Sequence, residues 1–166
     1  MHNQTKTWVE WVETVGMAFE MADDDGSRQR AEATSRAMLS GDRVSQGLGI
    51  ELLDAGPGRA SLSMVVTDSM LNRFGTCHGG ILFIFADTAL SCACNSYNLR
   101  SVAHHCSIVF LRPGKLGERL TATATERSRT DRIGIYDVSI FDASGEIVGE
   151  FFGHARNIGG HVIDER

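Results

Sequence analysis

Residues 72–87 read Asn72-Arg73-Phe74-Gly75-Thr76-Cys77-His78-Gly79-Gly80-Ile81-Leu82-Phe83-Ile84-Phe85-Ala86-Asp87, and they decide the fold of this chain. A polar, glycine-rich turn opens here into an apolar helix that carries one carboxylate. The pair Gly79-Gly80 lets a ligand approach the backbone closely, and the first turn of a helix presents unpaired N–H groups at its positive end. Such an end polarises a carbonyl oxygen, whereas a carboxylate on an apolar helix is costly to bury without a function or a partner. The pattern therefore indicates chemistry on an acyl group.

Length and charge narrow the class of protein. With 166 residues and a net charge of -5, the chain is expected to form one core-rich domain and to bind no nucleic acid, because it lacks a basic surface. The most hydrophobic run, Ile81 to Cys94, is too short to span a bilayer and contains Asp87. Near the start, Glu10 and Glu13 interrupt the only apolar segment, which is unlike a signal peptide. We therefore expect a cytoplasmic protein with no membrane partner.

The four cysteines favour a reduced, buried state over a metal site or disulfides. Cys92 and Cys94 are two positions apart on the expected helix, so their side chains point to different faces. The sequence also lacks a Cys-x-x-Cys or His-x-x-x-His pair. We therefore expect no metal ligands.

The first 43 residues form a helical extension, and residues 44–166 form the main domain. Helical spacing of apolar residues predicts a helix over Thr5–Met21 and a second over Ser27–Leu39. A stripe containing Trp8 and Trp11 on the first helix is expected to dock onto the domain.

In most of the main domain, apolar and polar residues alternate with the period of a β-strand. The exception is one long helix, predicted at 79–96. Strands are predicted at 49–53, 59–66, 102–111, 119–127, 134–141 and 146–156. The turns at 112–115 and 142–145 are expected to join antiparallel neighbours. In the pair His104-His105, strand alternation places one ring inward. Because the helix is apolar nearly all round, the prediction is an α+β fold in which a curved antiparallel sheet wraps around one central helix.

These residues resemble a known family, and the resemblance runs in order over roughly residues 45–160. The segments that carry it are Leu71-Asn72 through Gly79-Gly80, Phe83, Ala86-Asp87-Thr88-Ala89, Ala93-Cys94-Asn95-Ser96, Phe110-Leu111-Arg112-Pro113-Gly114, Leu120-Thr121-Ala122-Thr123-Ala124, Gly134-Ile135-Tyr136-Asp137 and Arg156-Asn157-Ile158-Gly159-Gly160. The chain resembles the hotdog-fold acyl-CoA thioesterases, and within them the PaaI type associated with phenylacetate degradation.

The resemblance implies hydrolysis of an acyl-CoA thioester to a free acid and coenzyme A, without a metal or other cofactor, by a dimer that commonly pairs into a tetramer. It places Asp87 as the catalytic carboxylate and the Gly79 N–H on the thioester oxygen. Asn72 and His78 then flank the site, and Thr88 supplies a hydroxyl beside the acid. Further contacts to substrate are expected from Phe74, Gly80, Phe83, Asn95 and Arg112.

Helix geometry adds a constraint that does not depend on the family. Gly79 and Asp87 are eight positions apart, hence about 12 Å along one helix, and cannot both touch one carbonyl group. Two helices that run antiparallel across a twofold axis would bring Gly79 of one subunit to Asp87 of the other. The sequence therefore predicts a site shared between two subunits.

Several roles stay open at this stage. Asp87 either activates water as a general base or attacks the carbonyl to form a mixed anhydride. His78 either donates to the thioester or fixes the loop, and Asn72 either orients water or holds the turn. Arg112 either meets the phosphates of coenzyme A or lies in a solvated turn. The acyl group is aryl-acetyl, hydroxylated aryl-acetyl or medium-chain. Two other functions compete, a non-catalytic acyl-CoA sensor and an acyl-thioester hydratase or dehydratase.

Overall fold

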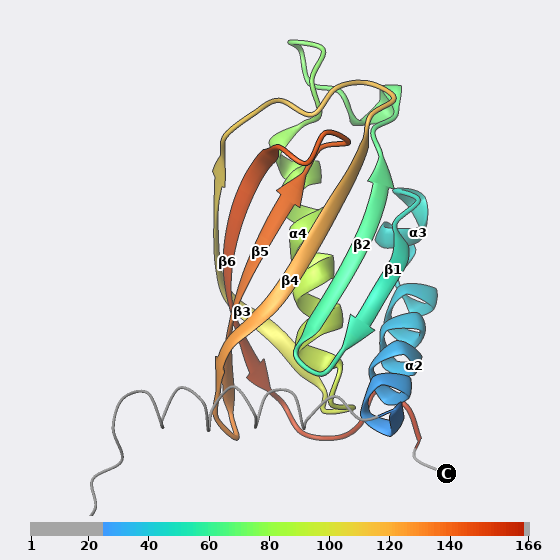
Figure 1. Cartoon of the computed structure of the whole chain (residues 1–166), viewed down its shortest axis with the longest axis vertical. Coiled ribbons are helices and arrows are strands. Elements are labelled where there is room, and N and C mark those ends of the chain that lie inside the picture. The colour runs from blue at the N-terminus through green and yellow to red at the C-terminus, as the bar shows by residue number, and fades with distance from the viewer. Residues whose placement is uncertain (1–24, 165–166) are drawn as a thin grey trace, which may run out of the picture.

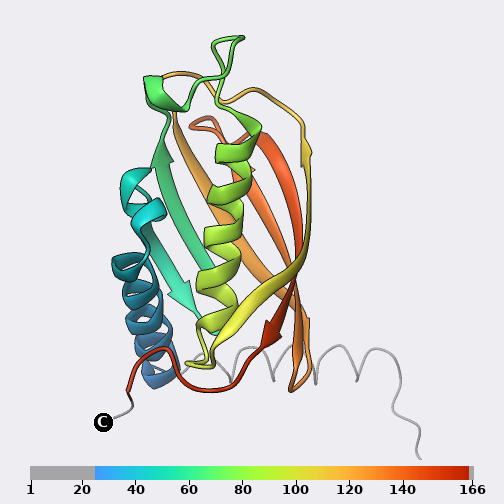
Figure 2. The ribbon, with the colours of Figure 1, turned by 180° about the vertical axis from the view of Figure 1, so that it is seen from behind.

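A computed structural model describes residues 25–164 of the chain, in which a sheet curves around one long helix (Figures 1 and 2). This arrangement confirms the predicted α+β fold. The helices are α2 (Asp25–Gly41), α3 (Arg43–Gly47) and α4 (Gly79–Asn95), with a short 3-10 turn, η1, at Asp68–Met70. The strands are β1 (Glu51–Gly56), β2 (Arg59–Val65), β3 (Ser101–Phe110), β4 (Arg119–Arg129), β5 (Ile133–Phe141) and β6 (Ile147–Asn157).

The central helix α4 forms because its sequence has a capping residue at the start and apolar residues on nearly every side. The side chain of His78 caps its N-terminus. Phe85, Ala86, Ala89 and Leu90 have no exposed surface, because the sheet and α2 cover them. Figure 2 shows α4 lying along the concave face of the sheet, with α2 beside it.

The six strands are all antiparallel, in the order β1-β2-β4-β5-β6-β3. The turn at 142–145 joins neighbours β5 and β6, as predicted. The prediction for the turn at 112–115 is wrong, because β3 pairs with β6 while β4 pairs with β2 and β5. The segment between β3 and β4 instead crosses the end of the sheet beside the start of α4 (Figure 1). Its proline and glycine are compatible with either connection, so local sequence alone did not distinguish them.

The edge strand β3 explains a second difference from the sequence analysis. His104 and His105 are both exposed, so the expectation that one ring points inward is wrong. The register shifts between Ala103 and His105, which breaks the strict alternation of the strand. Both rings lie near His154 on β6, with ring centroids 5.9 and 5.4 Å away.

The described part of the N-terminal region packs against the sheet and the central helix. Helix α2 is two residues longer at each end than the predicted 27–39, and it contacts β1 and α4. The short helix α3 was not predicted; Asp42 caps it by accepting a hydrogen bond from the Val44 N–H at 3.0 Å. The predicted helix over Thr5–Met21 lies outside the described residues, and the division of the chain at residue 43 stays a prediction. Within 25–164, no helix has the length and hydrophobicity needed to cross a membrane.

Candidate active site

The loop before α4 is held in shape by the side chain of Asn72. Its Oδ1 accepts hydrogen bonds from the backbone N–H groups of Phe74 and Thr76, at 2.8 and 3.3 Å. Its Nδ2 donates to the Thr76 hydroxyl at 2.9 Å. Of the two roles considered for Asn72, these contacts favour holding the turn.

The start of α4 presents one free backbone donor. His78 Nδ1 accepts the Gly80 N–H at 2.9 Å, which places the ring proton of the neutral imidazole on Nε2. No hydrogen bond within residues 25–164 uses the Gly79 N–H. The ring of Phe110 lies over Gly79, so close that an added Cβ would be 2.9 Å from Phe110 Cζ. The Gly79 N–H therefore has no partner within the described residues, belongs to a residue that lines a cavity, and is available to an acceptor.

The carboxylate of Asp87 lies two turns further along α4 and is half-buried. Burial raises the pKa of Asp87, because the charged form loses hydration. The Cys106 thiol, on β3, donates to Asp87 Oδ1 at 3.9 Å and partly opposes that rise. A half-buried carboxylate with a raised pKa is a stronger base than one in water.

Thr88 lies beside Asp87 and connects α4 to α3. Its hydroxyl donates to the Ile84 carbonyl at 2.8 Å and lies 3.4 Å from the Ser45 hydroxyl. Ser45 in turn donates to the carboxylate of Asp42. The three side chains form a polar chain from α4 to the cap of α3.

Gly79 and Asp87 open into different cavities of the single chain. A cavity of about 380 Å³ is lined by Asn72, Gly79 and Arg112 among others. A second cavity of about 390 Å³, here called the α3 cavity, lies between α4 and the segment 38–45, and it is lined by Asp87 and Thr88. This separation agrees with the helix spacing, because two groups about 12 Å apart on one helix cannot contact the same carbonyl group.

The other predicted contact residues are spread over the fold. Phe74 is 86% exposed at the tip of its loop, and Gly80 is exposed in the first turn of α4. Phe83 packs edge-to-face on Phe151, with centroids 5.2 Å apart. Arg112 lies in the Gly79 cavity, where its guanidinium is 2.7 Å from Glu146 and donates to the Ile147 carbonyl.

Asn95 lies at the opposite end of α4 from Gly79 and is buried. Its amide donates to the carbonyls of Ser91 and Ser101, at 2.9 and 3.0 Å, and its Oδ1 accepts the Ser101 N–H. These contacts fasten the end of α4 to β3, and the residue lines neither the Gly79 cavity nor the α3 cavity.

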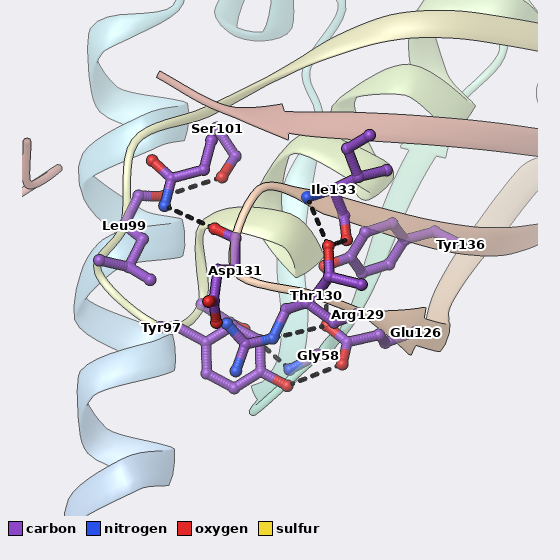
Figure 3. Close-up of polar contacts among 12 residues, drawn as sticks. Gly58, Tyr97, Leu99, Ser101, Glu126, Arg129, Thr130, Asp131, Ile133 and Tyr136 are labelled. Carbon is purple, nitrogen blue, oxygen red and sulfur yellow. Dashed lines mark hydrogen bonds and ion pairs between the residues drawn. The ribbon is translucent and has the colours of Figure 1, made fainter. Parts of the chain in front are cut away.

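A second polar cluster lies near that far end of α4 (Figure 3). Glu126 accepts from the hydroxyls of Tyr136 and Tyr97 at 2.7 and 3.3 Å, and the Arg129 guanidinium stacks 3.9 Å from the Tyr97 ring centroid. The adjoining cavity of about 20 Å³ has no room for a substrate. This cluster is structural, and local sequence does not reveal it because its members come from separate elements.

Three residues near Asp87 were not predicted: Asp42 and Ser45 line the same cavity, and Cys106 hydrogen-bonds to its carboxylate. Asp42 follows the break at Ser40-Gly41 and is therefore a recognisable N-cap of a new helix, whereas Ser45 carries no signal of its own. Cys106 gave no local signal, because its proximity to Asp87 depends on β3 lying alongside α4.

Comparison with known proteins places this geometry in a family. The sequence model of the family described as "Thioesterase superfamily" matches residues 74–148. The chain is 42% identical to "Acyl-coenzyme A thioesterase PaaI" of Escherichia coli (strain K12), over 82% of this chain and 97% of the relative. The chain belongs to the thioesterase superfamily. Its hotdog fold and its class, a thioester hydrolase, follow from that membership, as the sequence analysis expected.

Solved structures agree with this placement. The structure of the E. coli PaaI protein from the phenylacetic acid degradation operon superposes with a TM-score of 0.79, at 42% identity, and covers 81% of this chain and 97% of that one. A hypothetical thioesterase of Streptococcus pneumoniae, solved with coenzyme A, superposes with a TM-score of 0.66 at 27% identity, and covers 68% of this chain and 88% of that one.

Proposed function

We propose that this protein hydrolyses an acyl-CoA thioester to the free acid and coenzyme A, at a site shared between two subunits of a homodimer. The observation that carries the proposal is the position of Gly79 and Asp87 on one helix, open to different cavities. A free N–H at a helix start suits the developing oxyanion, and a half-buried carboxylate suits the base. The E. coli relative is named an acyl-coenzyme A thioesterase, and the S. pneumoniae structure contains coenzyme A, which supports this substrate class.

In the proposed reaction, Asp87 of one subunit takes a proton from water, and the water oxygen forms a bond to the thioester carbon. The carbonyl electrons move to the oxygen, which accepts the Gly79 N–H of the other subunit. The oxyanion re-forms the C=O bond as the C–S bond breaks, and the thiolate of coenzyme A takes up the proton held by Asp87. In the alternative route, Asp87 itself attacks the carbon, thiolate leaves, and water hydrolyses the mixed anhydride.

The edge strand β3 supports the dimer. It is the outermost strand on its side of the sheet, so one row of its backbone groups lacks a strand partner within residues 25–164. Val102, Val109 and Phe110 are exposed along it, at 46, 59 and 51%. Pairing of two β3 strands would cover both features, and the dimer would pair again into a tetramer through other surfaces.

For the acyl group, we propose an aryl-acetyl or hydroxylated aryl-acetyl thioester. The support is the E. coli relative, whose structure comes from a phenylacetic acid degradation operon. A cytoplasmic location and the absence of nucleic-acid and membrane partners belong to the same proposal. A non-catalytic sensor and a hydratase remain the competing functions.

The proposal is tested by following thiol release from phenylacetyl-, hexanoyl- and acetyl-CoA. The wild-type protein is compared with Asp87→Asn, which removes the base but retains the shape of the side chain, and with Asp87→Ala. We expect release by the wild type and a loss of at least about a hundredfold in kcat for both variants, since general-base catalysis contributes about 10²–10⁴.

The control is the quaternary state, measured by light scattering for all three proteins. Near-normal turnover by a correctly assembled Asp87→Asn dimer would overturn the role of Asp87. Tight acyl-CoA binding without any release would favour the sensor, and release from these saturated thioesters excludes a pure hydratase.

A further inference from the structure

The α3 cavity has one wall from α4 and one from the segment 38–45. Asp87 and Thr88 lie on the α4 wall, while Met38, Asp42 and Val44 lie on the opposite wall. The segment that carries the opposite wall was assigned from sequence to an extension or to its boundary with the main domain. The structure makes it part of the surroundings of Asp87.

Most of the uncharged residues that line the α3 cavity are apolar. Met38, Leu39, Val44 and Ile84 contribute hydrocarbon surface, and the volume of about 390 Å³ lies within the range of about 300–1,000 Å³ that is typical of small-ligand sites. An acyl chain gains binding for each methylene that leaves water, about fourfold per group. The size and lining therefore suit an acyl group longer than acetyl.

The charge in this cavity is negative on both walls. Asp42 faces it from the cap of α3, where its two oxygens accept from the Ser45 hydroxyl and the Val44 N–H. The Ser45 hydrogen bond holds the pKa of Asp42 below its ordinary value, so the carboxylate is ionised at neutral pH. Cys92, on the opposite wall, lines the same cavity; burial raises the pKa of its thiol, and the negative charge of Asp42 adds to that rise.

We propose that the α3 cavity is the acyl subsite of the site containing Asp87, and that Asp42 makes it selective for uncharged acyl groups over those ending in a carboxylate. The inference rests on the proposed thioesterase function. A third carboxylate in a space already lined by Asp42 and Asp87 would be repelled and would lose its hydration. Val44 limits the length of the acyl group from the same wall.

The test of charge selection compares two substrates of equal chain length, hexanoyl-CoA and the six-carbon dicarboxylic thioester adipoyl-CoA. Asp42→Asn removes the charge but retains an oxygen that caps α3, since Asn is as good an N-cap as Asp. We expect the hexanoyl-to-adipoyl ratio of kcat/KM to fall by about fivefold in this variant, the size of effect expected from removing one partly screened unit charge from the lining of the same cavity. The matched control is Asp25→Asn, which changes the net charge equally at the far end of α2 and should leave the ratio unchanged.

A second variant tests the location of the acyl group without altering charge. Val44→Phe enlarges a side chain that is 52% exposed and lines the cavity, so the fold can accommodate it. We expect the octanoyl-to-acetyl ratio of kcat/KM to fall at least about tenfold, the loss of about two buried methylenes. The matched control is Leu53→Phe, at a residue of β1 that is 56% exposed and lies outside the cavity lining.

The outcomes separate this inference from the proposed function. A wild-type protein that releases no thiol from any of these substrates or from phenylacetyl-CoA would refute the thioesterase. A wild-type protein that hydrolyses hexanoyl- and adipoyl-CoA equally well, or an unchanged ratio in Asp42→Asn, would refute charge selection by Asp42. An unchanged length profile in Val44→Phe would place the acyl group elsewhere.

Discussion

Replacing Gly79 by proline removes the proposed oxyanion donor with little change to the helix. Gly79 is the first residue of α4, where proline is tolerated because that N–H has no partner within the helix. His78, at φ -62° and ψ 134°, already has the extended backbone that a residue before proline requires. Gly79→Ala is the matched control, because both variants add a Cβ that meets the Phe110 ring while only proline removes the N–H. Any displacement of the Phe110 ring is therefore common to both variants and cancels in the comparison.

We expect Gly79→Pro to have a kcat about 10²–10³ lower than Gly79→Ala, the usual effect of losing one oxyanion-hole donor. The assay is thiol release from the best acyl-CoA substrate at saturating concentration. Equal turnover by the two variants would show that the Gly79 N–H does not contact the reacting oxygen.

The same variant tests whether the site is shared. Gly79→Pro and Asp87→Asn are each expected to be nearly inactive as homodimers. When the two are refolded together, half of the dimers are mixed, and each mixed dimer has one site with both groups intact, so the mixture should recover about a quarter of wild-type activity. If Gly79 and Asp87 of one chain formed the site, no dimer in the mixture would have an intact site. An inactive mixture that contains the mixed dimer would therefore refute the shared site.

Two further predictions concern stability. Asp87→Asn should have a higher Tm than the wild type at pH 8. Burial raises the pKa of Asp87, so the folded state holds the proton more tightly than the unfolded state. The wild type therefore loses stability as the pH rises above the ordinary pKa of 3.8. Calorimetry at several pH values checks this. A Tm difference between the two proteins that does not shrink as the pH falls toward 3.8 would contradict it. Tyr136→Phe should lower the free energy of unfolding by about 1–3 kcal/mol, because it leaves a half-buried Glu126 oxygen without its 2.7 Å donor. Urea denaturation measures this loss; unchanged stability, or a changed kcat/KM, would show that the cluster does not act as described.

Local periodicity was enough to predict most elements of the domain. The central helix was predicted one residue too long at its C-terminal end, and β2, β4 and β5 were predicted within a few residues, because alternation and glycine-rich turns are local signals. The neighbours of β3 were not predictable in this way. Its pairing with β6 depends on which strands close the sheet around α4, and the turn at 112–115 carries no information about that choice.

In the candidate site, too, residues with a local sequence signal were predicted, and residues that depend on tertiary contacts were not. Asp87 and Gly79 stood out because a carboxylate and a glycine pair are unusual on an apolar helix, and their spacing already indicated separate spaces. The neighbours of this part of α4 were not locally predictable. Cys106, which hydrogen-bonds to Asp87, lies on β3, and Ser45, which lies beside Thr88, is on α3. Asn95 was assigned to substrate from its motif, whereas its amide is occupied by backbone groups that the sequence does not reveal.

The place of β3 at the edge of the sheet has a consequence for biosynthesis. Its hydrogen-bonded partners run from Gly149 to Asn157, so the strand leaves the ribosome well before its partner strand in the same chain exists. Strands β1, β2, β4 and β5 can assemble as they emerge, but β3 must wait for the last strand, and such non-local pairing is slow. Because β3 carries the Cys106 thiol beside Asp87 and the Phe110 ring beside Gly79, a nascent chain acquires its reactive surroundings only in the final step of folding.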